Sequence, residues 1–204
     1  MKVSFHTVQL LFVTLILTSG CGDTPQLPRL SNDAVILAFG DSLTHGNGAS
    51  AEESYPAILE KLTGRKVINA GVSGEISEQG LKRLPGLLEK YQPKLLILCH
   101  GGNDILRKKD ITQMETNIKT MIELAQSKNI PVVLLSVPEF GLFLSPAKQY
   151  KDIAESTGVV FLEDLIPDVL SDNSLKSDTV HPNKEGYRVM AEAIYQVLKK
   201  AGAV

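Results

Sequence analysis

The sequence predicts an α/β fold, a three-layer sandwich of the flavodoxin-like kind in which helices cover both faces of a five-stranded parallel sheet. Three observations lead to this prediction. Short apolar runs recur along the chain, amphipathic segments of helical period separate them, and polar, glycine-containing stretches follow them. Strands of a parallel sheet are buried on both faces, so they are continuously apolar rather than alternating. The pattern does not predict the order of the strands.

The apolar runs are the expected strands, because each is short, partly β-branched and bounded by residues that favour turns. The strands are expected at residues 34–39, 66–69, 95–99, 131–135 and 159–161. Apolar residues spaced three and four apart predict the helices. The helices are expected at residues 55–62, 77–90, 111–127 and 147–157 and from Pro182 onward, with Pro85 bending the second.

Length and composition fit one globular domain. The chain has 204 residues, of which 43% are hydrophobic, and a formal net charge of −2. A nucleic-acid partner is not expected, because such proteins need a basic surface. No Cys/His spacing resembles a zinc site, so no metal is expected. Cys99 ends an apolar run and is expected to be a small buried residue, with a disulfide to Cys21 as the less favoured alternative.

The N-terminal residues have the pattern of an export signal. The apolar stretch at residues 8–17 fits the roughly 7–15 residues of a signal peptide and is too short to span a bilayer. Small residues then precede Cys21, as in bacterial lipoprotein signals, although Thr18 stands where Leu, Val or Ile is usual. The expected divisions are a signal peptide at 1–20, a lipidated Cys21 and tether at 21–33, and a domain at 34–204.

This pattern predicts a protein that is exported to the periplasm and held at a membrane through Cys21. The alternative is an ordinary secretory signal followed by an unrelated cysteine. A monomer is favoured.

Several polar residues that could carry chemistry follow the expected strands. Ser42, in a Gly-Asp-Ser-Leu run, follows the first strand, and Asn103 follows the third. Asp178 and His181 precede the last helix. Open α/β sheets bind ligands at the carboxyl ends of their strands, so these groups can meet despite their separation along the chain. Taken alone, Gly-Asp-Ser is also an ordinary turn sequence.

These residue types are the ones that acyl transfer needs. A serine hydroxyl is a weak nucleophile without an imidazole base, and Ser42 and His181 could form that pair. Asp178, three residues before His181, could fix its tautomer and stabilise the imidazolium. The N–H groups of Ser42 and Gly71 and the side-chain amide of Asn103 could stabilise an oxyanion.

The constellation resembles the SGNH branch of the GDSL hydrolase family, whose four sequence blocks centre on Ser, Gly, Asn and His. The matching residues, in family order, are Ser42, Gly71, Asn103 and His181. Residues 74–81 and 83–85 are similar to the bacterial multifunctional members of the family, which are acyl-CoA thioesterases, lysophospholipases and arylesterases. The Gly-x-Ser-x-Gly elbow of α/β-hydrolases is absent around Ser42, which disfavours that fold.

The resemblance implies the SGNH hydrolase fold and a serine hydrolase that cleaves small carboxylic esters and thioesters without a cofactor. An apolar loop after the fourth expected strand could form an acyl-binding wall or belong to the core. Its residues are Phe140, Leu142, Phe143 and Leu144. A carbohydrate O-deacetylase on the same fold is one alternative function. A binding lipoprotein without activity is another, which predicts that a catalytic residue is missing, and none is.

The other polar residues beside these loops are assigned no catalytic role. Asp41 and Asp104 are expected to form structural hydrogen bonds. His45 and His100 are expected to be structural or exposed.

Overall fold

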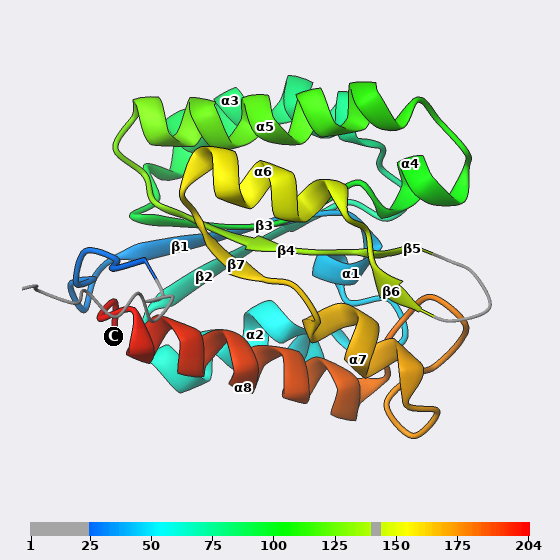
Figure 1. The fold of residues 1–204 in the computed structure, drawn as a ribbon. Helices are drawn as coiled ribbons and strands as arrows, with labels where there is room; N and C mark the ends of the chain where they lie inside the picture. The colour runs from blue at the N-terminus through cyan, green and yellow to red at the C-terminus, as the bar shows by residue number, and fades with distance from the viewer. Residues whose placement is uncertain (1–24, 140–143) are drawn as a thin grey trace, which may run out of the picture.

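The computed structural model describes residues 25–139 and 144–204. The expected signal peptide, Cys21 and the loop residues Phe140, Leu142 and Phe143 lie outside the described residues. Five strands form one parallel sheet in the order β2-β1-β3-β4-β7, with helices on both faces (Figure 1). The predicted fold class is confirmed, and the strand order is that of a flavodoxin-like sheet.

The five expected strands are all present, each within two residues of its predicted bounds. They are β1 (Val35–Gly40), β2 (Lys66–Gly71), β3 (Leu95–Cys99), β4 (Val132–Leu135) and β7 (Val160–Leu162). Strand β1 pairs in parallel with both β2 and β3, and Gly40 lies opposite both Gly71 and Cys99. These three strands therefore end at the same level, so the loops that follow them meet at one edge of the sheet.

The long amphipathic segments form the expected helices. They are α2 (Tyr55–Thr63), α3 (Ser77–Tyr91), α5 (Ile111–Ser127), α6 (Gln149–Thr157) and α8 (Lys184–Lys200). Figure 1 shows α3, α5 and α6 on one face of the sheet and α2 and α8 on the other. Helix α8 begins at Lys184 rather than Pro182, because the side chain of Asn183 caps it by accepting the N–H groups of Glu185 and Gly186.

The sequence analysis does not predict several short elements, whose few residues carry too little periodicity to be recognised. They are α1 (Ser42–His45), η1 (Ala51–Glu53), α4 (Gly102–Leu106), α7 (Leu165–Ser171) and the antiparallel pair β5 (Pro138–Glu139) and β6 (Ser145–Pro146). Two of them carry predicted site residues, because α1 begins at Ser42 and α4 contains Asn103.

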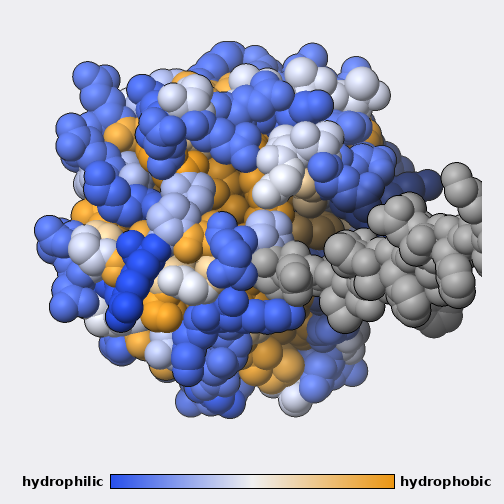
Figure 2. Space-filling view, turned by 60° about the vertical axis from the view of Figure 1, so that its left-hand side comes forward, coloured by the Kyte–Doolittle hydropathy of each residue, from blue (hydrophilic) through white to orange (hydrophobic). Residues whose placement is uncertain are grey.

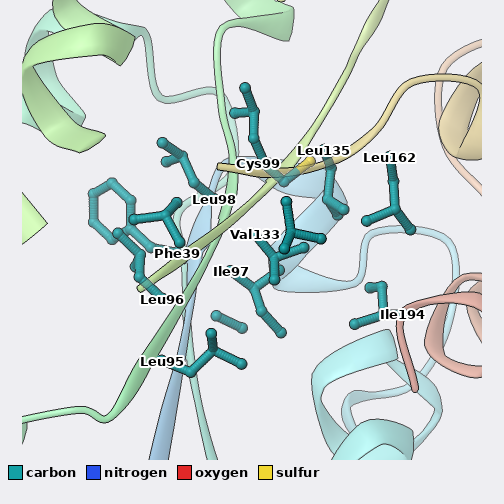
Figure 3. Close-up of a cluster of buried hydrophobic side chains, with 14 of the residues drawn as sticks. Phe39, Leu95, Leu96, Ile97, Leu98, Cys99, Val133, Leu135, Leu162 and Ile194 are labelled. Carbon is teal, nitrogen blue, oxygen red and sulfur yellow. The ribbon is translucent and has the colours of Figure 1, made fainter. Parts of the chain in front are cut away.

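The hydrophobic core lies on both faces of the sheet. Every residue of the central strand β3 is buried, and Figure 3 shows its side chains clustered with Phe39 of β1 and Ile194 of α8. Each such side chain contributes about 1.5–3 kcal/mol when it is fully buried. On the face shown in Figure 2, hydrophilic side chains surround smaller apolar patches.

The docked part of the chain begins before the expected boundary at residue 34. The N–H groups of Leu27 and Leu30 donate to the carbonyl oxygens of Ala201 and Ala203, and Leu30 is buried. These contacts bring the start of the described chain beside the C-terminus, at the end of the sheet opposite α1 (Figure 1). Among the described residues, no helix has the length and apolar character needed to cross a membrane.

Candidate active site

A pocket of about 250 Å³ opens where the loops after β1, β2 and β3 meet the segment before α8. Its polar lining includes Ser42, Gly74, Asn103 and His181. Its apolar lining consists of Leu43, Leu106, Val137, Pro138 and Val180. Residues from five separate parts of the chain, including the segment after β4, therefore share one hollow of mixed polarity.

The structure brings Ser42, His181 and Asp178 into one chain of contacts. Ser42 Oγ lies 3.0 Å from His181 Nε2, and His181 Nδ1 lies 2.8 Å from Asp178 Oδ2. An ionised carboxylate can only accept, so Nδ1 carries the hydrogen and Nε2 accepts the hydrogen bond of the serine hydroxyl. A nucleophile, a base and a group that orients the base are thus in contact in the required order.

Local hydrogen bonds hold Asp178 and His181 in this geometry. The Oδ1 atom of Asp178 accepts the N–H groups of Val180 and His181 at 2.8 and 2.9 Å, while Oδ2 faces the imidazole. Burial raises the pKa of the Asp178 carboxyl, but hydrogen bonds from His181 and Val180 outweigh burial and lower the pKa overall. Asp178 is therefore ionised at neutral pH, as an orienting carboxylate must be.

Ser42 is placed by the turn between β1 and α1. The carboxylate of Asp41 caps α1 by accepting the N–H of Leu43 at 3.1 Å, and its other oxygen accepts the amide of Asn103 at 3.3 Å. Asp41 is buried, and burial raises its pKa. Asp41 thus makes structural hydrogen bonds, and it joins the serine turn to the loop after β3.

Three candidate oxyanion donors belong to residues that line the pocket: the N–H groups of Ser42 and Gly74 and the side-chain amide of Asn103. Among residues 25–139 and 144–204, no acceptor takes the N–H of Ser42 or the N–H of Gly74. The side-chain amide of Asn103 donates to the carbonyl oxygen of Glu75 at 3.1 Å and to Asp41 at 3.3 Å. An anionic oxygen in the pocket would compete with the longer of these two bonds.

Gly71 is not one of the residues that the structure brings to the pocket. Its N–H donates to Asn69 Oδ1 at 3.0 Å. A Cβ atom on residue 71 would lie 2.1 Å from the backbone nitrogen of His45, so glycine is needed there for the close packing of β2 against α1. Gly74 does line the pocket, and its φ of 77° is a left-handed value that glycine adopts without strain.

The sequence contains a signal that could have found Gly74. It begins the stretch at residues 74–81 that resembles the multifunctional members of the family. Gly71 stands only three residues before it, and apolar periodicity does not distinguish a glycine needed for packing from one that lines a pocket.

The remaining predicted residues lie outside this constellation. Leu144 is half-buried against the core and does not line the pocket.

Cys99 is a free, buried thiol, and burial raises the pKa of this thiol well above its usual range. Asp104 is buried and accepts both the N–H and the hydroxyl of Ser77, a structural role as expected. Within the described residues, no group of three or more His, Cys, Asp or Glu side chains could hold a metal ion.

Comparison with known proteins agrees with this geometry. The model of the GDSL-like Lipase/Acylhydrolase family matches residues 38–189. Thioesterase 1/protease 1/lysophospholipase L1 of Escherichia coli (strain K12) is 31% identical over 165 residues, which cover 77% of this chain and 79% of that protein. An arylesterase of Vibrio mimicus is 31% identical over 176 residues, which cover 81% of this chain and 88% of that protein.

A solved structure supports the same relationship. The psychrotrophic esterase EstA from Pseudoalteromonas sp., in a structure inhibited by monoethylphosphonate, superposes with a TM-score of 0.72 and 28% sequence identity. The match covers 82% of this chain and 98% of that chain.

Proposed function

The chain belongs to the GDSL-like lipase/acylhydrolase family, and we propose that it is a serine esterase and thioesterase with Ser42 as its nucleophile. One observation carries the proposal: the contacts run from Ser42 Oγ through both nitrogens of His181 to Asp178 without a gap. Relatives named thioesterase, lysophospholipase and arylesterase support the same reaction class.

The proposed reaction proceeds through an acyl-enzyme. Ser42 Oγ attacks the acyl carbonyl carbon while His181 Nε2 takes the hydroxyl proton. The tetrahedral intermediate collapses when His181 returns this proton to the leaving alcohol or thiol, and the acyl group stays on Ser42. Water, activated by the same imidazole, then releases the carboxylic acid. Asp178 keeps the Nδ1 hydrogen in place and stabilises the imidazolium, and no step requires a cofactor.

The oxyanion of the intermediate is proposed to lie among three donors. These are the N–H groups of Ser42 and Gly74 and the side-chain amide of Asn103, with Gly74 taking the role that the sequence analysis assigned to Gly71. Donors placed before the reaction stabilise a developing charge without reorganisation, which is often the largest single contribution to catalysis.

We expect the acyl chain to lie on the apolar wall of the pocket, on which Leu106 is 44% exposed. Each methylene that the wall covers adds at most about 0.8 kcal/mol, so kcat/KM should rise with chain length and then level off. The test is a series of p-nitrophenyl esters and acyl-CoA thioesters from acetyl to dodecanoyl. We expect medium chains to exceed acetyl.

The same series separates the alternatives. Acetyl esters as the best substrates would favour a carbohydrate O-deacetylase, and hydrolysis that does not depend on Ser42 would overturn the proposed function.

Leu106→Ala tests the apolar wall. It should lower kcat/KM for octanoyl esters about threefold to tenfold and change kcat/KM for acetyl esters by no more than about twofold. Val72→Ala is the matched control, because Val72 is similarly exposed, at 42%, and does not line the pocket.

We also propose that the protein is exported and that Cys21 becomes its lipidated N-terminus, on the basis of the apolar segment and the small residues before Cys21. Several acyl chains on one cysteine suffice for stable anchoring, whereas one gives only marginal binding. Cys21→Ser should therefore move the protein from the membrane fraction to the soluble fraction. A wild-type N-terminus without a lipid adduct in mass spectrometry would contradict the proposal.

A further inference from the structure

A buried charged cluster lies directly behind the pocket, and the proposed reaction does not use it. It consists of Glu75, Arg83 of α3 and His100, which follows β3. The carboxylate of Glu75 accepts Arg83 Nε at 2.9 Å and Arg83 Nη2 at 2.6 Å. It also accepts His100 Nε2 at 3.1 Å. Three hydrogen bonds therefore hold one carboxylate that is only 7% exposed.

The protonation of this cluster follows from its hydrogen bonds. His100 Nδ1 accepts the N–H of Gly101 at 3.0 Å, so the ring hydrogen is on Nε2 and is donated to Glu75. Burial raises the pKa of Glu75, but the hydrogen bonds from His100 and Arg83 and the charge of Arg83 outweigh burial and hold the pKa at about 2. The cluster thus contains an ionised carboxylate paired with a guanidinium.

Glu75 is attached to the loop after β3 by both its side chain and its main chain. Its carboxylate bonds to His100, and its carbonyl oxygen accepts Asn103 Nδ2 at 3.1 Å. Its N–H donates to the carbonyl oxygen of Val72 at 3.1 Å and closes a β-turn whose third residue is Gly74. A φ above zero at that position is what a type II turn requires. The orientation of the Gly74 N–H and the direction of the Asn103 amide therefore depend on the same residue.

The cluster also touches the strand that leads to Ser42. The guanidinium of Arg83 lies 4.3 Å from the ring centroid of Phe39, near the end of β1. The glycine at position 80 of α3 leaves room for the His100 ring, since a Cβ there would lie 2.3 Å from Nε2. The hydroxyl of Tyr150 donates to the carbonyl oxygen of His100. Contacts from β1, α3 and α6 thus converge on this cluster.

We infer that Glu75, held by Arg83 and His100, is a positioning residue that fixes the separation between the N–H of Gly74 and the amide of Asn103. The inference rests on the proposed function, in which these two groups bind the oxyanion. Glu75 acts through them and does not touch the substrate, so it affects the tetrahedral intermediate more than the bound ester.

The experiment is Glu75→Gln, which keeps the shape of the side chain and removes its charge. We expect kcat to fall roughly 10- to 100-fold with KM within about threefold, because small displacements of a catalytic group cost on the order of 100-fold. The inhibition constant of a trifluoromethyl ketone, whose adduct with Ser42 carries the oxyanion, should rise by a similar factor. Glu78→Gln is the matched control, because Glu78 lies in the first turn of α3, three residues after Glu75, and pairs with Lys82 at the surface.

A double-mutant cycle distinguishes positioning from general loss of structure. Glu75→Gln should cost several-fold less in an Asn103→Ala enzyme than in the wild type, because one of the two donors that it places is gone. Equal losses in the two backgrounds, or a wild-type kcat for Glu75→Gln, would overturn the inference. Arg83→Lys is the second variant, to be used if Glu75→Gln does not fold. It keeps the positive charge but loses the bidentate contact with Glu75. An Arg83→Lys enzyme with full kcat would also overturn the inference. Activity that survives Ser42→Ala would instead overturn the proposed function.

Discussion

The two sides of the pocket are built in different ways. The base side, residues 177–183, carries Asp178 and His181, whose side chains are 55% and 18% exposed. The oxyanion side, residues 72–77 and 100–104, carries Glu75 and His100, which are buried. The paired carboxylate and imidazole are thus partly exposed on the base side and buried on the oxyanion side.

Hydrogen bonds on the base side join residues that are close in sequence. Asp178 bonds to the N–H groups two and three residues later, and Ser177 donates its N–H to the carbonyl oxygen of His181. The geometry that presents the imidazole is therefore a property of a short segment. Its exposure also gives water access to the acyl-enzyme.

Hydrogen bonds on the oxyanion side join residues far apart in sequence. Glu75 and His100 are 25 positions apart, and Asn103 and Asp41 are 62 apart. Ser77 donates its hydroxyl to Asp104 and accepts the amide of Asn117 from α5. Such a network forms only when the whole sheet is assembled, and it holds the donors rigidly, as preorganised electrostatic stabilisation requires. The comparison suggests that the two sides respond differently to substitution.

The largest expected effect comes from the contact that joins Ser42 to the base side. Ser42→Ala and His181→Ala should each lower kcat by roughly 10⁴–10⁶, and the double variant should lose little more, because the two residues act as a unit. Initial rates on a medium-chain p-nitrophenyl ester measure the loss. If the fold-decrease in kcat of the double variant equals the product of the two single decreases, the two residues act separately.

Asp178→Asn tests the base side alone. The asparagine Oδ1 can still accept the N–H groups of Val180 and His181, so the turn should be retained. Its amide, however, would donate where Asp178 accepts, which favours the wrong imidazole tautomer. We expect kcat to fall by about 10³–10⁴ at unchanged thermal stability. A drop in melting temperature that accompanies the lost activity would show that the carboxylate holds the segment rather than the imidazole.

Asn103→Ala tests the oxyanion side. Removing one oxyanion donor typically costs on the order of 10²–10³ in kcat. The same change leaves the carbonyl oxygen of Glu75 without its side-chain donor, so a moderate loss of stability is expected together with the loss of rate. Steady-state kinetics and thermal melting of the same preparation measure both. An effect confined to KM would argue against Asn103 as an oxyanion donor.

The same contrast explains what the sequence predicts and what it does not. The strands, the long helices and the pairing of Asp178 with His181 depend on local periodicity and short spacing, and sequence alone predicts them. The cluster around Glu75 depends on contacts across the assembled sheet, which no local pattern encodes, and apolar periodicity does not single out Gly74. The sequence analysis predicts Gly71 as a donor, whereas Gly74 lines the pocket, because residue type alone does not distinguish a glycine that packs closely from one in a turn beside a pocket. His100 is expected from the sequence only to be structural or exposed, since its partner Glu75 lies 25 positions away and no short spacing links the two.

The smallest expected effect is on stability, and it concerns how the contribution of Glu75, on the oxyanion side, depends on pH. The folded pKa of Glu75 is about 2, below its ordinary value of 4.5. A carboxyl with a lowered folded pKa stabilises the folded state above its unfolded pKa, and this contribution is lost as the pH falls toward the folded pKa. For Glu75 the loss occurs from pH 4.5 down to about 2. It amounts to up to about 3 kcal/mol, because one pKa unit corresponds to about 1.4 kcal/mol.

Urea unfolding of the wild type and of Glu75→Gln at pH 7, 4 and 3 tests this expectation. The variant lacks the titrating group, so its deficit in the free energy of unfolding should be largest at pH 7 and should shrink toward pH 3. Glu78→Gln should show a small deficit at every pH, because the exposed pair of Glu78 with Lys82 contributes little. A deficit for Glu75→Gln that stays constant down to pH 3 would mean that packing, rather than the ionised carboxylate, holds the oxyanion side. A shrinking deficit would show that the charge of Glu75 stabilises the buried side.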